Sequence, residues 1–255
     1  MKRVYSTLAT GEKHLGYYKM MAASFKRFNP NEELILFSDK DVAATNDPNF
    51  LYRSVPFIAN NLLNNGYDAV CHLDSDMIIT GNLDHIWEGD YDVAVVNNGN
   101  PRETKTQLVT VWDIHPFAYV NNGMVVLKGK EFVKHWLGLS YSPHFDNYQY
   151  KEQDLLNILV FYGNSGLGGP YKVRFLDRDS NKWHGLVAKQ YESQMILRDG
   201  KLILPKNEEW NKEEDKEIVC WHSAGGHNSP EKMNWRIRFQ PEVSKWIDGL
   251  VKEKR

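Results

Sequence analysis

The chain has 255 residues, of which 42% are hydrophobic and 25% charged, with a formal net charge of −2. These values are typical of a globular protein, and we expect one domain over residues 1–255. A charge so close to zero gives no electrostatic basis for binding nucleic acid or an acidic membrane. No apolar stretch approaches the roughly 20 residues of a transmembrane span, and the first residues lack the apolar region of a signal peptide. We therefore expect a cytoplasmic protein, with peripheral contact to a membrane left open.

The first part of the chain alternates between strand and helix patterns. Residues 4–8 and 33–37 are short apolar runs, and residues 14–28 carry apolar side chains every three or four positions, as one face of a helix does. A second helical stretch at 56–64 precedes a third apolar run, which ends at Asp74. This β-α-β-α-β order predicts an α/β fold with a mainly parallel central sheet flanked by helices.

Further elements follow in a less regular order. Strands are expected at 92–96, 123–127 and 217–221, and helices at 82–87 and 152–162. No repeat, low-complexity segment or linker interrupts them, so we place them in the same domain.

The chain is expected to end in an amphipathic helix at about 241–252. Its apolar face consists of Val243, Trp246, Ile247 and Leu250. We expect this face to dock on the core, and membrane contact is the alternative.

The two cysteines, Cys71 and Cys220, each lie within an apolar run typical of a strand. We expect both side chains to be buried and reduced.

Asp74 and Asp76 are the most informative residues of the sequence. They flank one serine between two apolar runs, so both carboxylates are expected where a buried strand ends. Two carboxylates this close do not both stay ionised unless a cation shares the site. Carboxylate oxygens suit Mn²⁺ or Mg²⁺, ions that usually accompany a phosphate-bearing substrate. The alternative is that one aspartate caps a turn and the other is solvated.

A second polar cluster follows the apolar run that ends at Trp221. His222 could complete a manganese site begun by carboxylates, although a histidine after a strand is more often structural. Gly225 and Gly226 would let backbone amides approach a phosphate, whose charge Lys232 could neutralise. Since open α/β sheets bind ligands beyond the carboxyl ends of their strands, we expect this cluster near the two aspartates.

Four blocks of the sequence, in order, resemble the retaining nucleotide-sugar glycosyltransferases of family 8, a GT-A-fold group that includes glycogenin and lipopolysaccharide galactosyltransferases. They are the strand end at 6–10, the Leu-Asp-x-Asp strand at 72–76 with the short helix 82–87, the Asn-x-Gly strand at 121–126, and the helix start at 152–157. The resemblance implies the GT-A (nucleotide-diphospho-sugar transferase) fold and transfer of a hexose-type sugar with retention of anomeric configuration.

By this resemblance, Asp74, Asp76 and His222 bind Mn²⁺ or Mg²⁺, which bridges the diphosphate of the donor. A looser fifth match begins at His222 and implies that the Gly225 loop and Lys232 hold the same phosphates.

The resemblance also implies a nucleotide site for a UDP-sugar donor. His14 stands where these enzymes commonly place a tyrosine against uracil, so either His14 or one of Tyr17 and Tyr18 takes that role. The implied nucleotide-binding residues are Thr7, Leu8, Thr10, His14 and Ser75.

The transferred sugar is implied to meet Asn121 and Asn122, with Glu152, Gln153 and Asp154 as the catalytic candidates. Glu152 is a better nucleophile than Gln153, and an inverting enzyme would use Glu152 or Asp154 as base. The structural alternative for the two acids is stabilisation of a helix N-terminus.

Two positions depart from the family pattern. The helix before the two aspartates usually carries a basic residue, but residues 56–58 are Pro-Phe-Ile and Arg53 is the nearest candidate. Asn234 replaces the proline of the Lys-Pro-Trp sequence.

The acceptor is expected to be a glycan, glycolipid or protein. Residues 101–118 and 141–150 are rich in aromatic side chains, which suit sugar rings as well as ordinary packing. We expect these two stretches to form the walls of the acceptor site.

Three other functions fit parts of the pattern. A haloacid-dehalogenase-type phosphatase also has an Asp-x-Asp strand, but that fold opens with it, and here two β-α units come first. A sugar-nucleotide pyrophosphorylase requires a glycine-rich loop after the first strand, where this chain has Ala9, Thr10 and Gly11. A non-catalytic nucleotide-sugar-binding protein would have no use for the metal ligands Asp74, Asp76 and His222.

Overall fold

The structure is a computed structural model of the whole chain. The residues it describes are 1–45, 47, 49–98, 118–162, 171–179, 181–185, 187, 189–207, 213–223 and 235–252.

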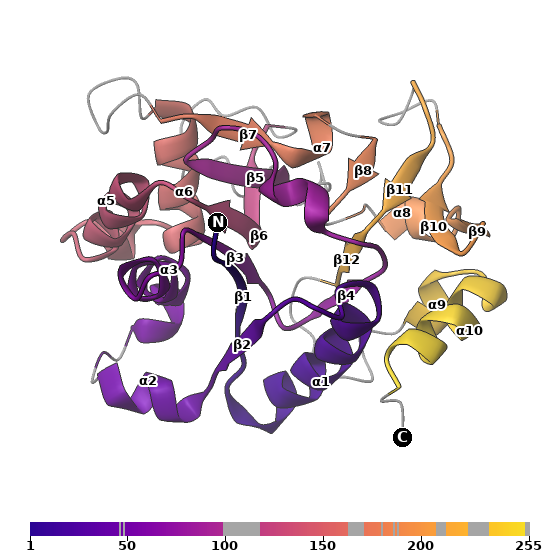
Figure 1. Ribbon diagram of the computed structural model, residues 1–255, viewed down its shortest axis with the longest axis horizontal. Helices are drawn as coiled ribbons and strands as arrows, with labels where there is room; N and C mark the ends of the chain where they lie inside the picture. The colour runs from indigo at the N-terminus through magenta and orange to yellow at the C-terminus, as the bar shows by residue number, and fades with distance from the viewer. Residues whose placement is uncertain are drawn as a thin grey trace.

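A six-stranded sheet lies at the centre, in the order β2-β1-β3-β6-β5-β7 (Figure 1). Its strands are β1 (Arg3–Leu8), β2 (Leu34–Phe37), β3 (Ala69–Leu73), β5 (Val93–Asn97), β6 (Val120–Leu127) and β7 (Val173–Phe175). β1 is parallel to β2 and β3, and β5 is parallel to β7, whereas β6 is antiparallel to both neighbours. The predicted α/β fold with a mainly parallel sheet is confirmed, with β6 as the exception.

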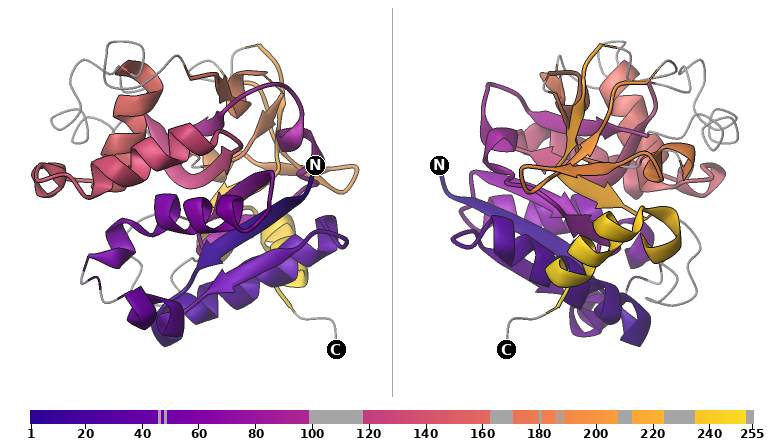
Figure 2. Two further views of the ribbon diagram at one scale, coloured as in Figure 1. Left: turned by 60° about the vertical axis from the view of Figure 1, so that its left-hand side comes forward. Right: turned by 90° about the vertical axis from the view of Figure 1, so that its right-hand side faces the viewer.

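Helices cover both faces of this sheet (Figures 1 and 2). The main ones are α1 (Gly11–Phe28), α3 (Ser54–Asn64), α5 (Lys130–Ser140) and α6 (Glu152–Tyr162). Successive strand residues point to opposite faces. Val4 and Val70 belong to the core that includes α3, α5 and α6, whereas Tyr5 and Cys71 belong to the core that includes α1.

Shorter elements surround this unit, and most of them have no clear signal in the sequence. They are α2 (Asp39–Thr45), η1 (Phe50–Tyr52), η2 (Asp84–Trp87), η3 (Phe145–Asn147), α7 (Leu176–Asp179), α8 (Lys189–Glu192), α9 (Trp235–Arg238), and the four-stranded sheet of β8 (Lys182–Trp183), β11 (Lys216–Ile218), β10 (Lys201–Leu204) and β9 (Ile196–Arg198).

The C-terminal helix, α10 (Pro241–Leu250), docks on the protein as predicted. Val243 and Ile247 are buried in a third core. The Trp246 ring lies 6.3 Å from the ring of Phe28 at the end of α1.

The strand expected at 217–221 is wrong in its extent, because the chain changes sheets at Val219. Lys216–Ile218 forms β11, and Cys220–His222 forms β12, which pairs antiparallel with β4 (Met77–Ile79). In this register His222 is opposite Met77, the residue after Asp76. His222 therefore lies within a strand instead of after one, and the pairing brings it to the two aspartates.

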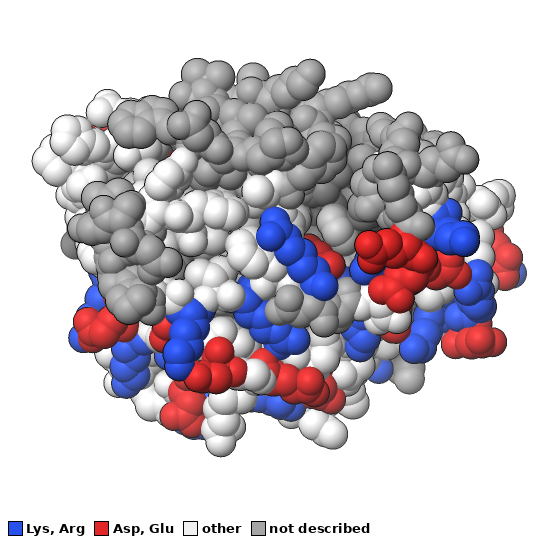
Figure 3. Space-filling view, turned by 90° about the horizontal axis from the view of Figure 1, so that it is seen from above, with Lys and Arg blue, Asp and Glu red and all other residues white. Residues whose placement is uncertain are grey.

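The described surface is of mixed charge. In the view of Figure 3, acidic and basic side chains lie among one another without separating into fields of one sign. No described helix has both the length and the hydropathy that crossing a membrane requires.

The predicted burial of both cysteines gives a test of the core. Cys71 on β3 and Cys220 on β12 are free and fully buried, and burial raises the pKa of each thiol. We expect the native protein to react with Ellman's reagent only as fast as it unfolds, because the thiolate is the reactive form. In guanidinium chloride, both thiols should react at once. Rapid labelling of either cysteine without denaturant would contradict this core.

Candidate functional site

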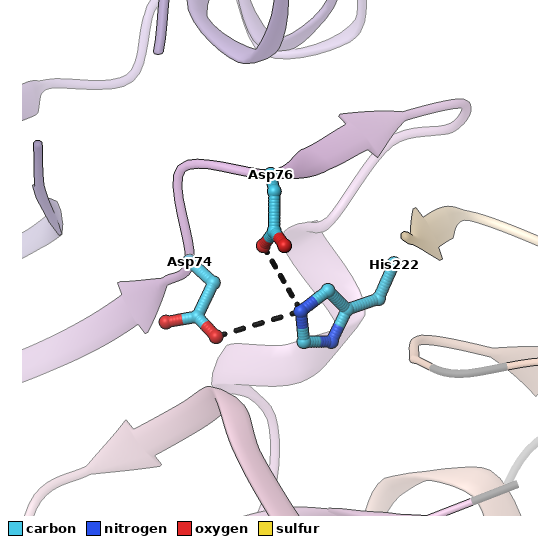
Figure 4. A group of neighbouring side chains, drawn as sticks. All are labelled: Asp74, Asp76 and His222. Carbon is cyan, nitrogen blue, oxygen red and sulfur yellow. Dashed lines mark hydrogen bonds and ion pairs between the residues drawn. The ribbon is translucent and has the colours of Figure 1, made fainter. Parts of the chain in front are cut away.

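The two aspartates lie where β3 ends. Asp74 follows the last residue of β3, and Asp76 precedes β4, with Ser75 between them. The Met77 N–H donates to the Asp74 carbonyl at 3.3 Å, which closes a tight turn. This turn presents both carboxylates on the same side, as Figure 4 shows.

His222 faces both carboxylates (Figure 4). Its Nε2 atom lies 3.1 Å from an Asp76 oxygen and 3.5 Å from an Asp74 oxygen. Ligand atoms of the three side chains all lie within 4.8 Å of one another. The imidazole is 2% exposed, whereas the Asp74 side chain is 38% and the Asp76 side chain 21% exposed. The carboxylates are therefore open to a ligand, with the histidine buried behind them.

The charges of the three groups stabilise one another. Burial lowers the pKa of His222, but the charges of Asp76 and Asp74 outweigh this effect and raise it above its usual value. Burial raises the pKa of Asp74, but His72 and His222 outweigh it and lower it overall. Two carboxylates and one imidazole nitrogen are a donor set that Mn²⁺ accepts. The chemistry and spacing of these residues thus fit a divalent ion, held by Asp74, Asp76 and Nε2 of His222.

Gly123 makes room for the histidine ring. A Cβ atom on this residue would lie 2.3 Å from Cε1 and 2.6 Å from Nδ1 of His222. The Gly123 carbonyl also accepts the N–H of Asp74 at 2.7 Å. The glycine of the Asn-Asn-Gly sequence is therefore a contact point for two of the three candidate ligands.

A pocket of about 320 Å³ opens in front of the carboxylates. Its described lining combines the ends of β1 and β3 with the starts of α1, α3 and α6. The lining residues are Leu8, Thr10, His14, Leu51, Ser54, Val55, His72, Asp74, Ser75, Asp76, Asn122 and Glu152.

Most of the predicted site residues thus gather around one pocket. Of the nucleotide-binding candidates, Leu8, Thr10, His14 and Ser75 line it. Thr7 is fully buried beneath them, and its hydroxyl has no hydrogen-bond partner among the described residues.

Some predicted residues lie outside the described part of the chain. These are Gly225, Lys232, Asn234 and nearly all of the aromatic stretch 101–118.

Glu152 is the catalytic candidate that faces the pocket. It begins α6, and its Oε1 atom accepts a hydrogen bond from Asn122 Nδ2 at 3.2 Å. Burial, with a contribution from the charge of Asp74, raises its pKa to about 8. Trp136 of α5 donates its indole N–H to the Glu152 carbonyl at 2.8 Å and so fixes the start of the helix.

Gln153 and Asp154 lie behind the pocket in a buried hydrogen-bond network. The Tyr119 hydroxyl donates to Asp154 at 2.5 Å and accepts from Gln153 Nε2 at 3.3 Å. The other Asp154 oxygen accepts the N–H of Tyr150. Gln153 Oε1 accepts from Asn121 Nδ2 at 3.1 Å. Gln153, Asp154 and Asn121 are therefore not brought to the described pocket lining.

Several lining residues had no assigned role in the sequence. His72 lies two residues before Asp74 on the same strand, and its Nε2 atom is 3.6 Å from an Asp74 oxygen. The period of two along a strand could have identified it. Leu51, Ser54 and Val55 had no such signal, because their segment reaches the pocket only through the tertiary fold.

Arg53 is held within the protein instead of pointing to a donor. Its guanidinium pairs with Asp47 at 2.8 Å and donates to the Ser140 carbonyl at 2.7 Å. The side chain is 13% exposed. The expectation that Arg53 supplies the family's basic contact is not supported by this placement.

Comparison with known proteins places this site in a recognised fold. No family model and no curated protein matches the sequence. Among solved structures, the galactosyltransferase LgtC in complex with donor and acceptor sugar analogues aligns with a TM-score of 0.55 and 14% identity, over 98% of this chain and 97% of LgtC. A glycosyltransferase involved in glycosylation of the major capsid of PBCV-1 gives 0.52 and 11%, over 97% and 98%. Mouse xyloside xylosyltransferase 1 gives 0.51 and 9%, over 90% and 99%. The chain has the GT-A fold of these glycosyltransferases, as its sequence motifs predicted.

Proposed function

We propose that this chain is a glycosyltransferase that moves a hexose-type sugar from a nucleotide-sugar donor, a UDP-sugar, to a glycan, glycolipid or protein acceptor. The observation that carries the proposal is the cluster of Asp74, Asp76 and His222, whose two carboxylates line a pocket. The pocket lies beyond the carboxyl ends of β1 and β3, where open α/β sheets bind ligands.

The fold neighbours support this choice of reaction. All three of those compared are glycosyltransferases, and the LgtC structure contains sugar analogues of both substrates. A pocket lined by carboxylates, histidines and small polar residues suits the diphosphate and ribose of such a donor once a cation is present.

The candidate metal ligands and Glu152 have different roles in the proposed reaction. A bound Mn²⁺ or Mg²⁺ ion would supply the positive charge that stabilises the departing nucleoside diphosphate. Asp74, Asp76 and His222 would hold that ion in place. Glu152 projects into the same pocket, where its carboxyl group would face the transferred sugar, oriented by Asn122.

Retention of anomeric configuration is part of the proposal. Gln153 and Asp154 have most of their polar atoms bonded within the protein, so we assign them to the positioning of Asn121 and Asn122. Glu152 is then our candidate for the nucleophile or the general base. LgtC also has an active-site glutamine, whose replacement by glutamate has been crystallised, and Gln153 is our candidate for a comparable position.

The first test is nucleotide release from a panel of UDP-, GDP- and dTDP-sugars. We expect release from a UDP-sugar only with Mn²⁺ or Mg²⁺ present, and a loss of about 100-fold or more in Asp76→Asn, because one charged ligand is removed. Asp90→Asn is the matched control, since Asp90 pairs with Lys172 on the surface. Release that persists in EDTA would contradict the metal site, and binding of the donor without release would indicate a non-catalytic binding protein.

The second test concerns the room that Gly123 leaves for His222. We expect Gly123→Ala to weaken Mn²⁺ binding about 10- to 100-fold, because the added methyl group displaces the histidine. Isothermal titration calorimetry measures this without any substrate. Gly138→Ala is the matched control, because a Cβ atom at this position of α5 meets nothing within 4 Å. Equal affinity in both variants would rule out His222 as a ligand.

A further inference from the structure

The described residues include few large apolar side chains that are strongly exposed. Apart from Met1, they are Leu51, Tyr52 and Tyr141, with 49%, 53% and 53% of their surface exposed. Leu51 also lines the pocket. Leu51 and Tyr52 are adjacent in the chain, and Tyr141 contacts Arg53, the residue that follows Tyr52.

Tyr141 packs against the partly buried Arg53. The guanidinium centre lies 4.8 Å from the Tyr141 ring and 4.7 Å from the ring of Phe145. Asp47 accepts hydrogen bonds from the same guanidinium through both oxygens. Because Arg53 covers one face of the ring, the exposure of Tyr141 belongs to the opposite face and the edge.

This ring joins two walls of the pocket. Arg53 lies between Leu51 and Ser54 in the chain, and both of these residues line the pocket. On the other side, Phe145 stacks with Lys151, 5.6 Å away, and Lys151 immediately precedes Glu152. Through Arg53, the Tyr141 ring is therefore connected to two segments that contribute residues to the pocket lining.

We propose that Tyr141, backed by Arg53, is a stacking platform for a saccharide unit of the acceptor, with Leu51 between the platform and the pocket. This role rests on the proposed glycosyl transfer. It specifies that the part of the acceptor in contact with Tyr141 is a carbohydrate. An aromatic face suits the apolar face of a sugar ring. A ring that is already immobilised loses little entropy when the sugar binds.

The charges around the platform favour a saccharide over an anionic lipid surface. An acidic headgroup would need cations that are free to bind it. Arg53 is paired with Asp47 at 2.8 Å, and Lys151 is paired with Asp146 at 3.3 Å.

Saturation-transfer difference NMR tests the platform directly. The probes are methyl glycosides of glucose, galactose, N-acetylglucosamine and mannose, together with maltose, cellobiose and lactose. We expect at least one to bind the wild-type protein and Tyr141→Phe, and to bind Tyr141→Leu about fivefold or more weakly, because leucine keeps the apolar bulk but lacks the ring.

Tyr67→Leu is the matched control. The Tyr67 ring also carries a cation, Lys2 at 4.3 Å, and its hydroxyl donates to Glu33 at 2.9 Å. It lies just before β3, at the opposite end of that strand from Asp74. This variant should bind the probes like the wild-type protein, and thermal melts would show whether each variant is folded.

The outcomes separate the platform from the proposed function. Saccharide binding that depends on Tyr141, without nucleotide release from any donor, would support the platform and overturn the transferase. Nucleotide release combined with saccharide binding that is absent, or unchanged in Tyr141→Leu, would overturn the platform. The platform would also be overturned if no saccharide binds and the protein instead binds phosphatidylglycerol vesicles in a way that Tyr141→Leu abolishes. That result would indicate a lipid-binding surface.

Discussion

The hydrogen bond from the Asp74 N–H to the Gly123 carbonyl, 2.7 Å long, is the constraint on which the site depends. It exists because β6 runs antiparallel to β3, so that the residues before Met124 continue past the point where β3 ends. The same strand direction carries Asn121 and Asn122 towards the start of α6. One reversed strand thus places a glycine against His222, Asn122 beside Glu152 and Asn121 beside Gln153.

The buried network behind the pocket fixes side chains that could otherwise turn. Because the Tyr119 hydroxyl donates to Asp154, its oxygen is left to accept from Gln153 Nε2. The amide oxygen of Gln153 must then face Asn121 and the N–H of Asn122. A network of this kind is stabilising only when every member has a partner. The acids of one helix turn therefore have different environments, with Asp154 paired in the core and Glu152 open to the pocket.

The parts of the fold that the sequence predicts are those with strong periodic patterns. The helices α1, α3 and α6 were predicted from their regular apolar spacing, and the strand before Asp74 from a continuous apolar run that is buried on both faces. The four-stranded sheet was not, since strands of two to four residues are too short to show a period. The reversed direction of β6 was missed for another reason, since direction depends on pairing partners and not on local pattern.

The candidate site shows the same division between local and tertiary signals. Asp74, Asp76 and His222 could be predicted because their residue types at strand ends are chemically specific. Their grouping in the structure agrees with that prediction, although the binding of an ion stays a prediction. The sequence could not predict that Glu152 lines the pocket whereas Asp154 is buried behind it. This difference depends on the hydrogen bond from Tyr119 to Asp154, which only the tertiary fold brings about. The position of Arg53 likewise depends on Tyr141 and Phe145, which are distant in the chain.

Sequence separation also determines when the site can form during folding. Asp76 and His222 are 146 positions apart and meet only through the pairing of β4 with β12. Contacts of such long range have a high entropic cost and are expected to form late. Asp74 and Asp76 lie in one turn, and before β12 pairs the imidazole of His222 is not there to offset their mutual repulsion, which leaves only His72 beside Asp74. The three-residue cluster therefore belongs to the completed fold and not to its N-terminal half alone.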